Sequence, residues 1–235
     1  MQKNAVRILL TFVVIVTSFV LVASIACFLP STPKKVFEES LQSVVEIKAY
    51  SKEFGESYGT AVFVNEDGTL ISNSHVVTYQ RMGEANVFDE YSIRFASEEA
   101  YNKVELLKYD LEKDIAVLKI VDTSLSFSPI KIGNSDRLSF GETVYAIGNG
   151  SNFGLSITHG IVSIPKVVIN YEGIQREVIQ SDITISAGNS GGALLDNKGK
   201  LIGITSFRTK DNQGNVVYGL VYSIPINTVM QYLED

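Results

Sequence analysis

The sequence predicts an all-β domain, a sandwich or barrel, that ends in one short helix and follows an apolar N-terminal segment. From residue 44 onward, short apolar or alternating runs recur between turn residues. Asp67-Gly68 joins two of these runs, and Asn197-Lys198-Gly199 joins two others, as in β-hairpins. Clear helical periodicity appears after Asn227, which can cap a helix over 227–234.

The first element is an uncharged segment over 8–29 that follows the basic residues Lys3 and Arg7. As a helix it would extend roughly 33 Å, enough to cross a bilayer. We therefore expect a cytoplasmic N-terminus (1–7), a transmembrane signal anchor (8–29) and a stalk (30–40). The remaining chain, 41–235, would lie on the extracytoplasmic side of the cell membrane.

Two other interpretations of this segment stay open. Ser24-Ile25-Ala26 offers the small residues that a signal peptidase requires, and cleavage there would give a secreted protein. Cys27 could instead carry a lipid, although Ser24 stands where a lipoprotein signal normally has leucine.

The strands follow in order along the chain. The apolar, β-branched run over 115–121 is typical of a buried strand, whereas the polar residues 80–90 predict a surface loop. The other strands are expected at 44–50, 60–64, 69–72, 91–95, 103–107, 142–147, 160–163, 166–169, 177–180, 192–196, 200–206 and 216–223.

Composition excludes several classes of function. The net charge of −6 and the lack of a Lys/Arg cluster argue against a nucleic-acid partner. The single cysteine excludes an intrachain disulfide and a cysteine metal site. The chain has only two histidines, His75 and His159, and no His-x-x-x-His pair, so no metal site is expected.

One serine, Ser190, stands in Gly188-Asn189-Ser190-Gly191-Gly192 between two apolar strands. A serine hydroxyl becomes nucleophilic when a base removes its proton and amide donors receive the resulting oxyanion. Glycines allow the tight turn that directs backbone N–H groups to one point. A simple Gly-Ser surface turn would have the same composition, so this window alone leaves both interpretations open.

A histidine and an aspartate precede the serine. His75 follows an apolar strand end in Ser72-Asn73-Ser74-His75, and Asp114 directly precedes the expected strand 115–121. Each is more often structural when considered alone. An aspartate that accepts a hydrogen bond from a histidine fixes its tautomer and stabilises the imidazolium, as a catalytic triad requires.

Together these windows resemble the trypsin-like (chymotrypsin-fold) serine proteases, and within them the HtrA-type branch. The resemblance covers about residue 41 to the C-terminus and implies two six-stranded β-barrels, about 41–135 and 140–222, with an active-site cleft between them. The residues that carry it are 70–77, the Asp-x-Ala-Val-Leu-Lys strand Asp114–Lys119, 180–195 and the ending Gly219–Asn227.

The resemblance also implies residue roles. Ser190 would attack the carbonyl, His75 would act as base, Asp114 would orient His75, and the N–H groups of Gly188 and Ser190 would form the oxyanion hole. The activity would be endopeptidase cleavage of extracytoplasmic proteins, for which quality control is the family's usual task. No cofactor is expected. The partners would be protein or peptide substrates and the bilayer, and a homotrimer is compatible with the family.

Three departures from the family pattern stand out. Ala193 replaces the usual proline after the serine motif, and Ala187 replaces a frequent proline, which would soften the oxyanion loop. No PDZ domain is expected after the C-terminal helix.

The resemblance suggests a primary pocket for small or medium apolar residues. Thr184, six residues before the nucleophile, would lie at its base and is not acidic, so cleavage after Lys or Arg is not expected. The segment 205–207 would pair with the substrate backbone as an added strand. The residues expected to contact substrate are Thr184, Thr205, Ser206, Phe207, Gly219 and Leu220.

Three alternatives remain. A glutamyl endopeptidase would need an added histidine in the pocket, and His159 is the candidate, although its sequence position favours a surface or loop histidine. The chain could be a binding or sensory module that kept the fold without turnover. It could also be a processing protease with one dedicated target.

Overall fold

The computed structural model describes residues 12–13, 15–17, 32–96, 98–171, 173–210, 213 and 215–235. The chain divides into two compact units, Met1–Ser31 and Thr32–Asp235. The expected N-terminus 1–7 and most of the expected anchor 8–29 lie outside the described residues. Within the residues that are described, no helix is both long and apolar enough to span a membrane.

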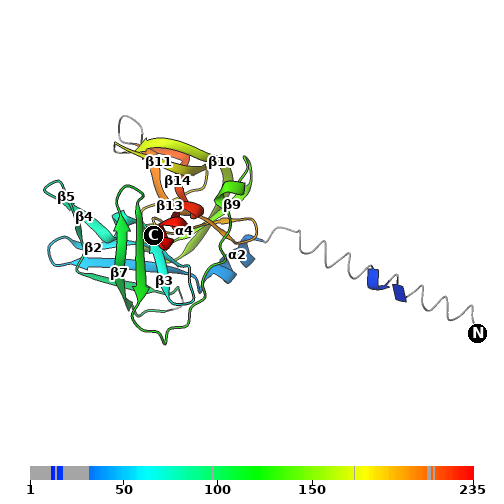
Figure 1. Ribbon diagram of the computed structural model, residues 1–235, viewed down its shortest axis with the longest axis horizontal. Helices are drawn as coiled ribbons and strands as arrows, with labels where there is room; N and C mark the ends of the chain where they lie inside the picture. The colour runs from blue at the N-terminus through cyan, green and yellow to red at the C-terminus, as the bar shows by residue number, and fades with distance from the viewer. Residues whose placement is uncertain are drawn as a thin grey trace, which may run out of the picture. The chain divides into compact units, whose positions relative to one another are not determined.

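The second unit is mostly β and contains two closed six-stranded sheets (Figure 1). The first closes in the order β1-β2-β3-β8-β7-β6, with antiparallel pairing throughout. Its Asp67-Gly68 turn leads from the second strand to the third, and Gly68 has a φ of +84°. The strand bounds are β1 Val44–Ser51, β2 Gly55–Phe63, β3 Thr69–Ser72, β6 Glu90–Arg94, β7 Asn102–Asp110 and β8 Ile115–Ile120.

The second sheet closes in the order β10-β11-β14-β13-β12-β9, again antiparallel. Strand β10 is the longest of this sheet, because it continues through Pro165 where two separate strands, 160–163 and 166–169, were expected. The register against β11 shifts between Val162 and Ile164 and again between Ile164 and Val167. The second shift spans the proline, which has no N–H to donate. The strand bounds are β9 Thr143–Gly148, β10 Ser156–Tyr171, β11 Ile174–Ser181, β12 Ala193–Asp196, β13 Leu201–Lys210 and β14 Val216–Pro225.

The expected polar loop 80–90 is instead largely a two-stranded ribbon of β4 (Thr78–Arg81) and β5 (Glu84–Val87). Met82 and Gly83 connect the strands with φ values of 52° and 86°. Two positive φ angles match the hairpin turn whose twist fits paired strands. Polarity alone therefore gave the wrong secondary structure for this segment.

Helices at both ends of the unit also differ from expectation. The segment expected as a stalk forms helix α2 (Pro33–Ser40), capped by Thr32 and anchored by buried Val36. The C-terminal helix α4 (Ile226–Glu234) forms as expected, but Pro225 holds the cap position. The expected cap Asn227 lies inside the helix, where its side chain accepts from the Ser135 N–H at 3.3 Å. The short helices are α3 Ser74–Val77, η1 Ser135–Arg137 and η2 Gly150–Asn152.

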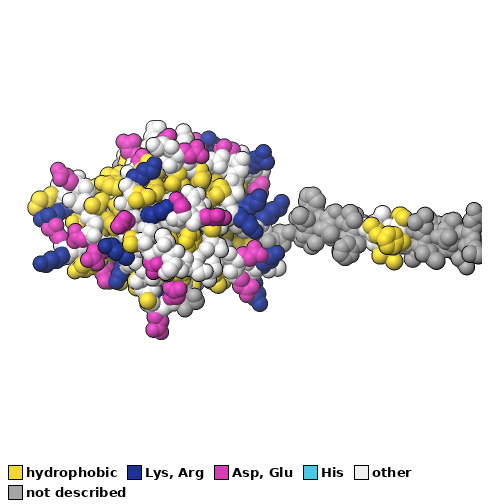
Figure 2. Space-filling view, turned by 60° about the horizontal axis from the view of Figure 1, so that its bottom comes forward, with side chains coloured by type: hydrophobic (Ala, Val, Ile, Leu, Met, Phe, Trp, Pro, Cys, Tyr) yellow, Lys and Arg dark blue, Asp and Glu magenta, His cyan; other side chains and the backbone are white. Residues whose placement is uncertain are grey.

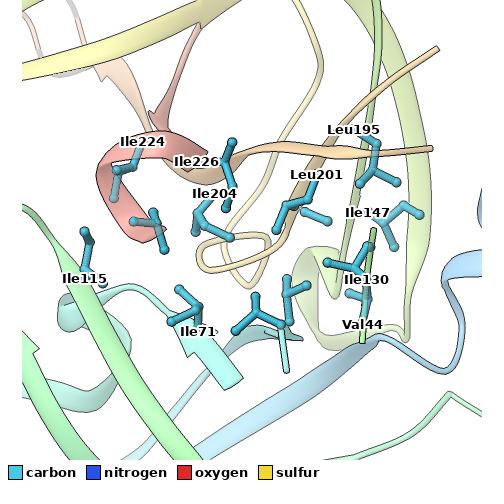
Figure 3. Close-up of a cluster of buried hydrophobic side chains, with 14 of the residues drawn as sticks. Val44, Ile71, Ile115, Ile130, Ile147, Leu195, Leu201, Ile204, Ile224 and Ile226 are labelled. Atoms are coloured by element: carbon cyan, nitrogen blue, oxygen red, sulfur yellow. The ribbon is translucent and has the colours of Figure 1, made fainter. Parts of the chain in front are cut away.

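An apolar cluster joins the two sheets (Figure 3). Val44, Ile71 and Ile115 enter it from the first sheet, and Ile147 and Ile204 enter it from the second. All five are at most 1% exposed. Removal of this much apolar surface from water holds the two sheets in one orientation, which fixes the residues at their junction.

The surface carries both signs of charge. Lys and Arg side chains alternate with Asp and Glu over the face in Figure 2, without a broad area of one sign.

We expect Ile71→Ala to lower the free energy of unfolding by about 2–5 kcal/mol, because it leaves a cavity between the sheets. Leu107→Ala is the control, since Leu107 is 56% exposed on β7, and its effect should be within about 0.5 kcal/mol. Urea unfolding measures both. Equal changes in unfolding free energy for the two substitutions would contradict the conclusion that this cluster holds the two sheets together.

Candidate functional site

His75 lies in the single-turn helix α3, directly after strand β3. Its side chain is 48% exposed, so the ring can reach both solvent and the protein interior. The neighbouring Asn73 side chain donates to the Asp114 carbonyl at 2.9 Å, which ties this turn to the start of β8. The local fold therefore brings the histidine and aspartate windows together.

Asp114 receives a shell of donors. Its Oδ1 and Oδ2 lie 2.9 and 3.0 Å from Nδ1 of His75. The backbone N–H of His75 and the hydroxyl of Ser74 donate to Oδ1 at 3.2 and 3.0 Å, and the hydroxyl of Ser206 donates to Oδ2 at 2.5 Å. Asp114 itself has a φ of +57°, a conformation that Asp tolerates better than most residues. A carboxylate that is 2% exposed thus has its oxygen atoms satisfied.

These contacts decide the charge of Asp114. Burial alone would raise the pKa of its carboxyl group, but the charge and hydrogen bond of His75, together with the Ser206 hydroxyl, hold the pKa below its ordinary value. The ionised carboxylate only accepts hydrogen bonds, so Nδ1 of His75 must donate. In the neutral ring Nε2 is therefore unprotonated and able to act as a base.

Ser190 lies across the cleft from this pair and shares a neighbour with it. The Ser190 hydroxyl donates to the Ser206 carbonyl at 3.0 Å, and within the described residues it makes no hydrogen bond to His75. Ser206 sits at a register shift in β13, between the pairs Thr205↔Ser223 and Phe207↔Tyr222. This bulge lets one residue hold Asp114 with its side chain and Ser190 with its backbone.

The serine loop is clamped from the first sheet by Thr60. The Thr60 N–H donates to the Ser190 carbonyl at 2.9 Å, and its hydroxyl donates to the Gly188 carbonyl at 2.7 Å. Gly188 has a φ of +94°, and a Cβ there would lie 2.1 Å from the Asn149 carbonyl oxygen. Only glycine fits that backbone. No local signal marks Thr60, because its partner Gly188 lies 128 residues away in the sequence.

The amides expected to receive an oxyanion are available. Among the described residues, neither the Gly188 N–H nor the Ser190 N–H donates to a protein acceptor, while both adjoining carbonyl groups are held by Thr60. The loop is therefore fixed by its carbonyl groups and keeps these two donors unused. An anionic oxygen bound near Ser190 would accept hydrogen bonds from these two N–H groups.

A cleft of about 530 Å³ contains His75, Asp114 and Ser190. Its walls beside Ser190 are the segments 185–187 and 206–208, and the β10–β11 hairpin forms a further wall. Its lining residues are Ser74, His75, Thr78, Gln80, Leu111, Asp114, Tyr171, Ile174, Arg176, Ile185, Ser186, Ala187, Ser190, Ser206, Phe207 and Arg208.

The cleft brings only some of the expected substrate contacts together. Ser206 and Phe207 line it, whereas the Thr205 hydroxyl is buried below and donates to the Asn189 carbonyl at 2.6 Å. Thr184, Gly219 and Leu220 are not among its described lining residues, and Thr184 is exposed to solvent. The sequence missed Arg176 and Arg208, since arginines in strands are unremarkable until packing is known.

The second histidine does not join this site. His159 is exposed on β10, and its ring lies 6.5 Å from the ring of Tyr145. It does not line the cleft described above. Within the described residues, no group of His, Cys, Asp and Glu is arranged to hold a metal ion.

Comparison with known proteins finds a matching family and several similar chains. The trypsin-like peptidase domain family matches residues 59–204. The serine protease Do-like HtrA of Lactobacillus helveticus is 31% identical over 194 residues, covering 81% of this chain and 44% of the relative. The periplasmic pH-dependent serine endoprotease DegQ of Escherichia coli (strain K12) is 35% identical over 185 residues, covering 77% and 38%.

Solved structures are similar as well. The HtrA-type protease AlgW with a tripeptide has a TM-score of 0.72 and 28% sequence identity, covering 87% of this chain and 63% of that chain. The chain spans less than half the length of the two curated relatives named above.

The lowered pKa of Asp114 predicts a pH-dependent stability. The stabilisation is fully present above the ordinary carboxyl pKa of about 4 and is lost as the pH falls through the lower folded-state pKa. We expect Asp114→Asn to cost about 1–3 kcal/mol of unfolding free energy at pH 7. The difference from wild type should shrink below about pH 4. Urea unfolding across pH 3–7 measures this, and a difference independent of pH would contradict it.

Proposed function

Because the chain belongs to the trypsin-like peptidases and its homologues are HtrA-type serine proteases, we propose that it is a serine endopeptidase. One observation carries the proposal: Ser206 holds the Asp114 carboxylate and the Ser190 hydroxyl at once, in the cleft that also contains His75. Quality control of extracytoplasmic proteins is the biological role that best fits these homologues.

The proposed reaction has two halves, acylation of Ser190 and hydrolysis of the acyl-enzyme, and His75 and Asp114 act in both. The Ser190 oxygen attacks the substrate carbonyl carbon while Nε2 of His75 takes the hydroxyl proton. The oxyanion accepts from the N–H groups of Gly188 and Ser190. His75 then protonates the leaving amine, and the C–N bond breaks. Water hydrolyses the acyl-enzyme by the same route. The ionised Asp114 stabilises the imidazolium that forms in both halves.

The first step requires a change at Ser190. Its hydroxyl now donates to the Ser206 carbonyl and must turn to Nε2 of His75 before it can lose its proton. Rotation of a serine side chain is a small movement between staggered rotamers. The same hydrogen bond is the observation that favours the second candidate, a catalytically silent binding or sensory module.

Two preferences for the residue before the scissile bond have support in the cleft. Ile185, Ala187 and Phe207 offer apolar contacts for the small or medium apolar residues expected from the sequence. Arg176 and Arg208 offer positive charge, which favours the glutamyl-endopeptidase alternative. His159 would not contribute to the second preference from its exposed position on β10.

We propose an extracytoplasmic location, because relatives such as DegQ are described as periplasmic. We also propose that residues 8–29 anchor the chain. The full chain should then sediment with membranes and resist carbonate extraction, whereas a chain starting at residue 32 should be soluble. Mass spectrometry should recover the intact N-terminal peptide of the mature protein. A mature N-terminus after Ala26 would instead show that the segment is a cleaved signal.

A fluorophosphonate probe tests the catalytic proposal, since it reacts with an activated serine. We expect labelling at Ser190 and its loss in Ser190→Ala, with kcat/KM for peptide cleavage falling by about 10⁴-fold or more. Ser139→Ala is the matched control, because Ser139 is exposed and outside the cleft. Absence of label at Ser190 in the wild-type protein would favour the silent module.

A further inference from the structure

Two arginines line the cleft without forming an ion pair with any described carboxylate. Arg81 and Arg94 pair with Glu53 and Glu46 elsewhere on the chain. Arg176 and Arg208, by contrast, form no salt bridge within the described residues, and their side chains donate only to backbone carbonyl groups. Half-buried guanidinium groups with donors to spare are suited to bind a carboxylate.

Arg208 connects the two segments that form the walls of the cleft beside Ser190. It lies on β13 two residues after Ser206, and its Nη1 donates to the Ile185 carbonyl at 3.0 Å. Ile185 belongs to the opposite wall, five residues before Ser190. The guanidinium thus bridges the two walls that flank the nucleophile. Its Nε and Nη2 groups have no acceptor among the described residues.

Arg176 extends the positive charge along the hairpin wall. Its Nε and Nη2 donate to the carbonyl groups of Glu112 and Leu111 at 2.7 and 2.9 Å. The guanidinium also lies 5.7 and 6.0 Å from the ring centres of Tyr171 and Phe207. These contacts fix the position of the Arg176 guanidinium. It therefore contributes a fixed positive charge to the cleft and does not move to contact a substrate.

The acid that lines this cleft does not neutralise the two arginines. Asp114 is the one Asp or Glu among the described lining residues, and its oxygen atoms already accept from His75, Ser74 and Ser206. One carboxylate against two guanidinium groups leaves the described lining with a net charge of +1 when His75 is neutral (2 − 1 = 1). A negatively charged side chain of the substrate would meet complementary charge and unused donors at one place.

We propose that Arg208 determines specificity and that the enzyme prefers Asp or Glu immediately before the scissile bond. The inference rests on the proposed peptidase function. A carboxylate in this position would accept from Nε and Nη2 of Arg208 in the bidentate arrangement that guanidinium groups favour. Ile185 and Phe207 would contact the methylene groups of the same side chain. Acidic selectivity then arises without His159.

The test compares matched peptides that carry Glu, Gln or Val before the scissile bond. Glu and Gln have the same shape, so their ratio of kcat/KM isolates the charge. For the full chain in detergent we expect Glu to exceed Gln by about 10- to 100-fold. Arg208→Gln should bring that ratio close to one. Arg137→Ala is the charge-matched control, because Arg137 is exposed on η1, and it should keep the wild-type ratio.

Three outcomes would overturn the inference. If the wild-type protein cleaves Gln or Val peptides with the same kcat/KM as Glu peptides, Arg208 does not select acids. The peptidase function would still stand. If Arg208→Gln raises kcat/KM for all three peptides by the same factor, Arg208 blocks the pocket sterically instead of binding a substrate carboxylate. If a fluorophosphonate fails to label Ser190 in the wild-type protein, the peptidase function fails and the inference fails with it.

Discussion

The site depends on the cost of burying the Asp114 carboxylate. A charged group that is 2% exposed is tolerated only when hydrogen bonds replace its lost hydration. The donors come from both closed sheets: Ser74 and His75 from the turn after β3, and Ser206 from β13. Satisfying one carboxylate therefore requires the sheets to meet in one orientation. The same contact sets the imidazole tautomer and places the base.

Thr60 repeats this logic on the other side of the nucleophile. It is fully buried on β2 and holds the carbonyl groups of Gly188 and Ser190. The apolar cluster that joins the two sheets, which includes Ile71 and Ile147, supplies the stability for these polar contacts. Hydrogen bonds between the sheets specify the arrangement, and apolar burial makes it stable. Neither the hydrogen bonds nor the apolar burial alone would hold the Ser190 loop in a conformation that leaves the N–H groups of Gly188 and Ser190 without a protein acceptor.

This division explains what the sequence could predict. The β class, the Asp67-Gly68 turn and the C-terminal helix depend on local signals that are readable in a short window. The positions of Thr60 and Ser206 depend on contacts between distant segments, and a buried threonine or serine carries no local mark. The ribbon β4–β5 was missed for a related reason, since polar strands lack the apolar alternation that predicts them. The expected anchor lies mostly outside the described residues and remains a prediction.

Specificity is the property furthest from the reach of local signals. Arg208 follows Phe207 in an ordinary strand, and only the packing of β13 against the segment 185–187 turns its guanidinium across the cleft. The chain as a whole carries a net charge of −6, so its long-range field repels the acidic peptides that this cleft would favour. Salt screens that distant repulsion over about 8–10 Å but weakens a half-buried contact much less. Acid selection through Arg208 is therefore a short-range effect, and moderate salt should speed encounter with acidic substrates while it leaves their discrimination largely intact.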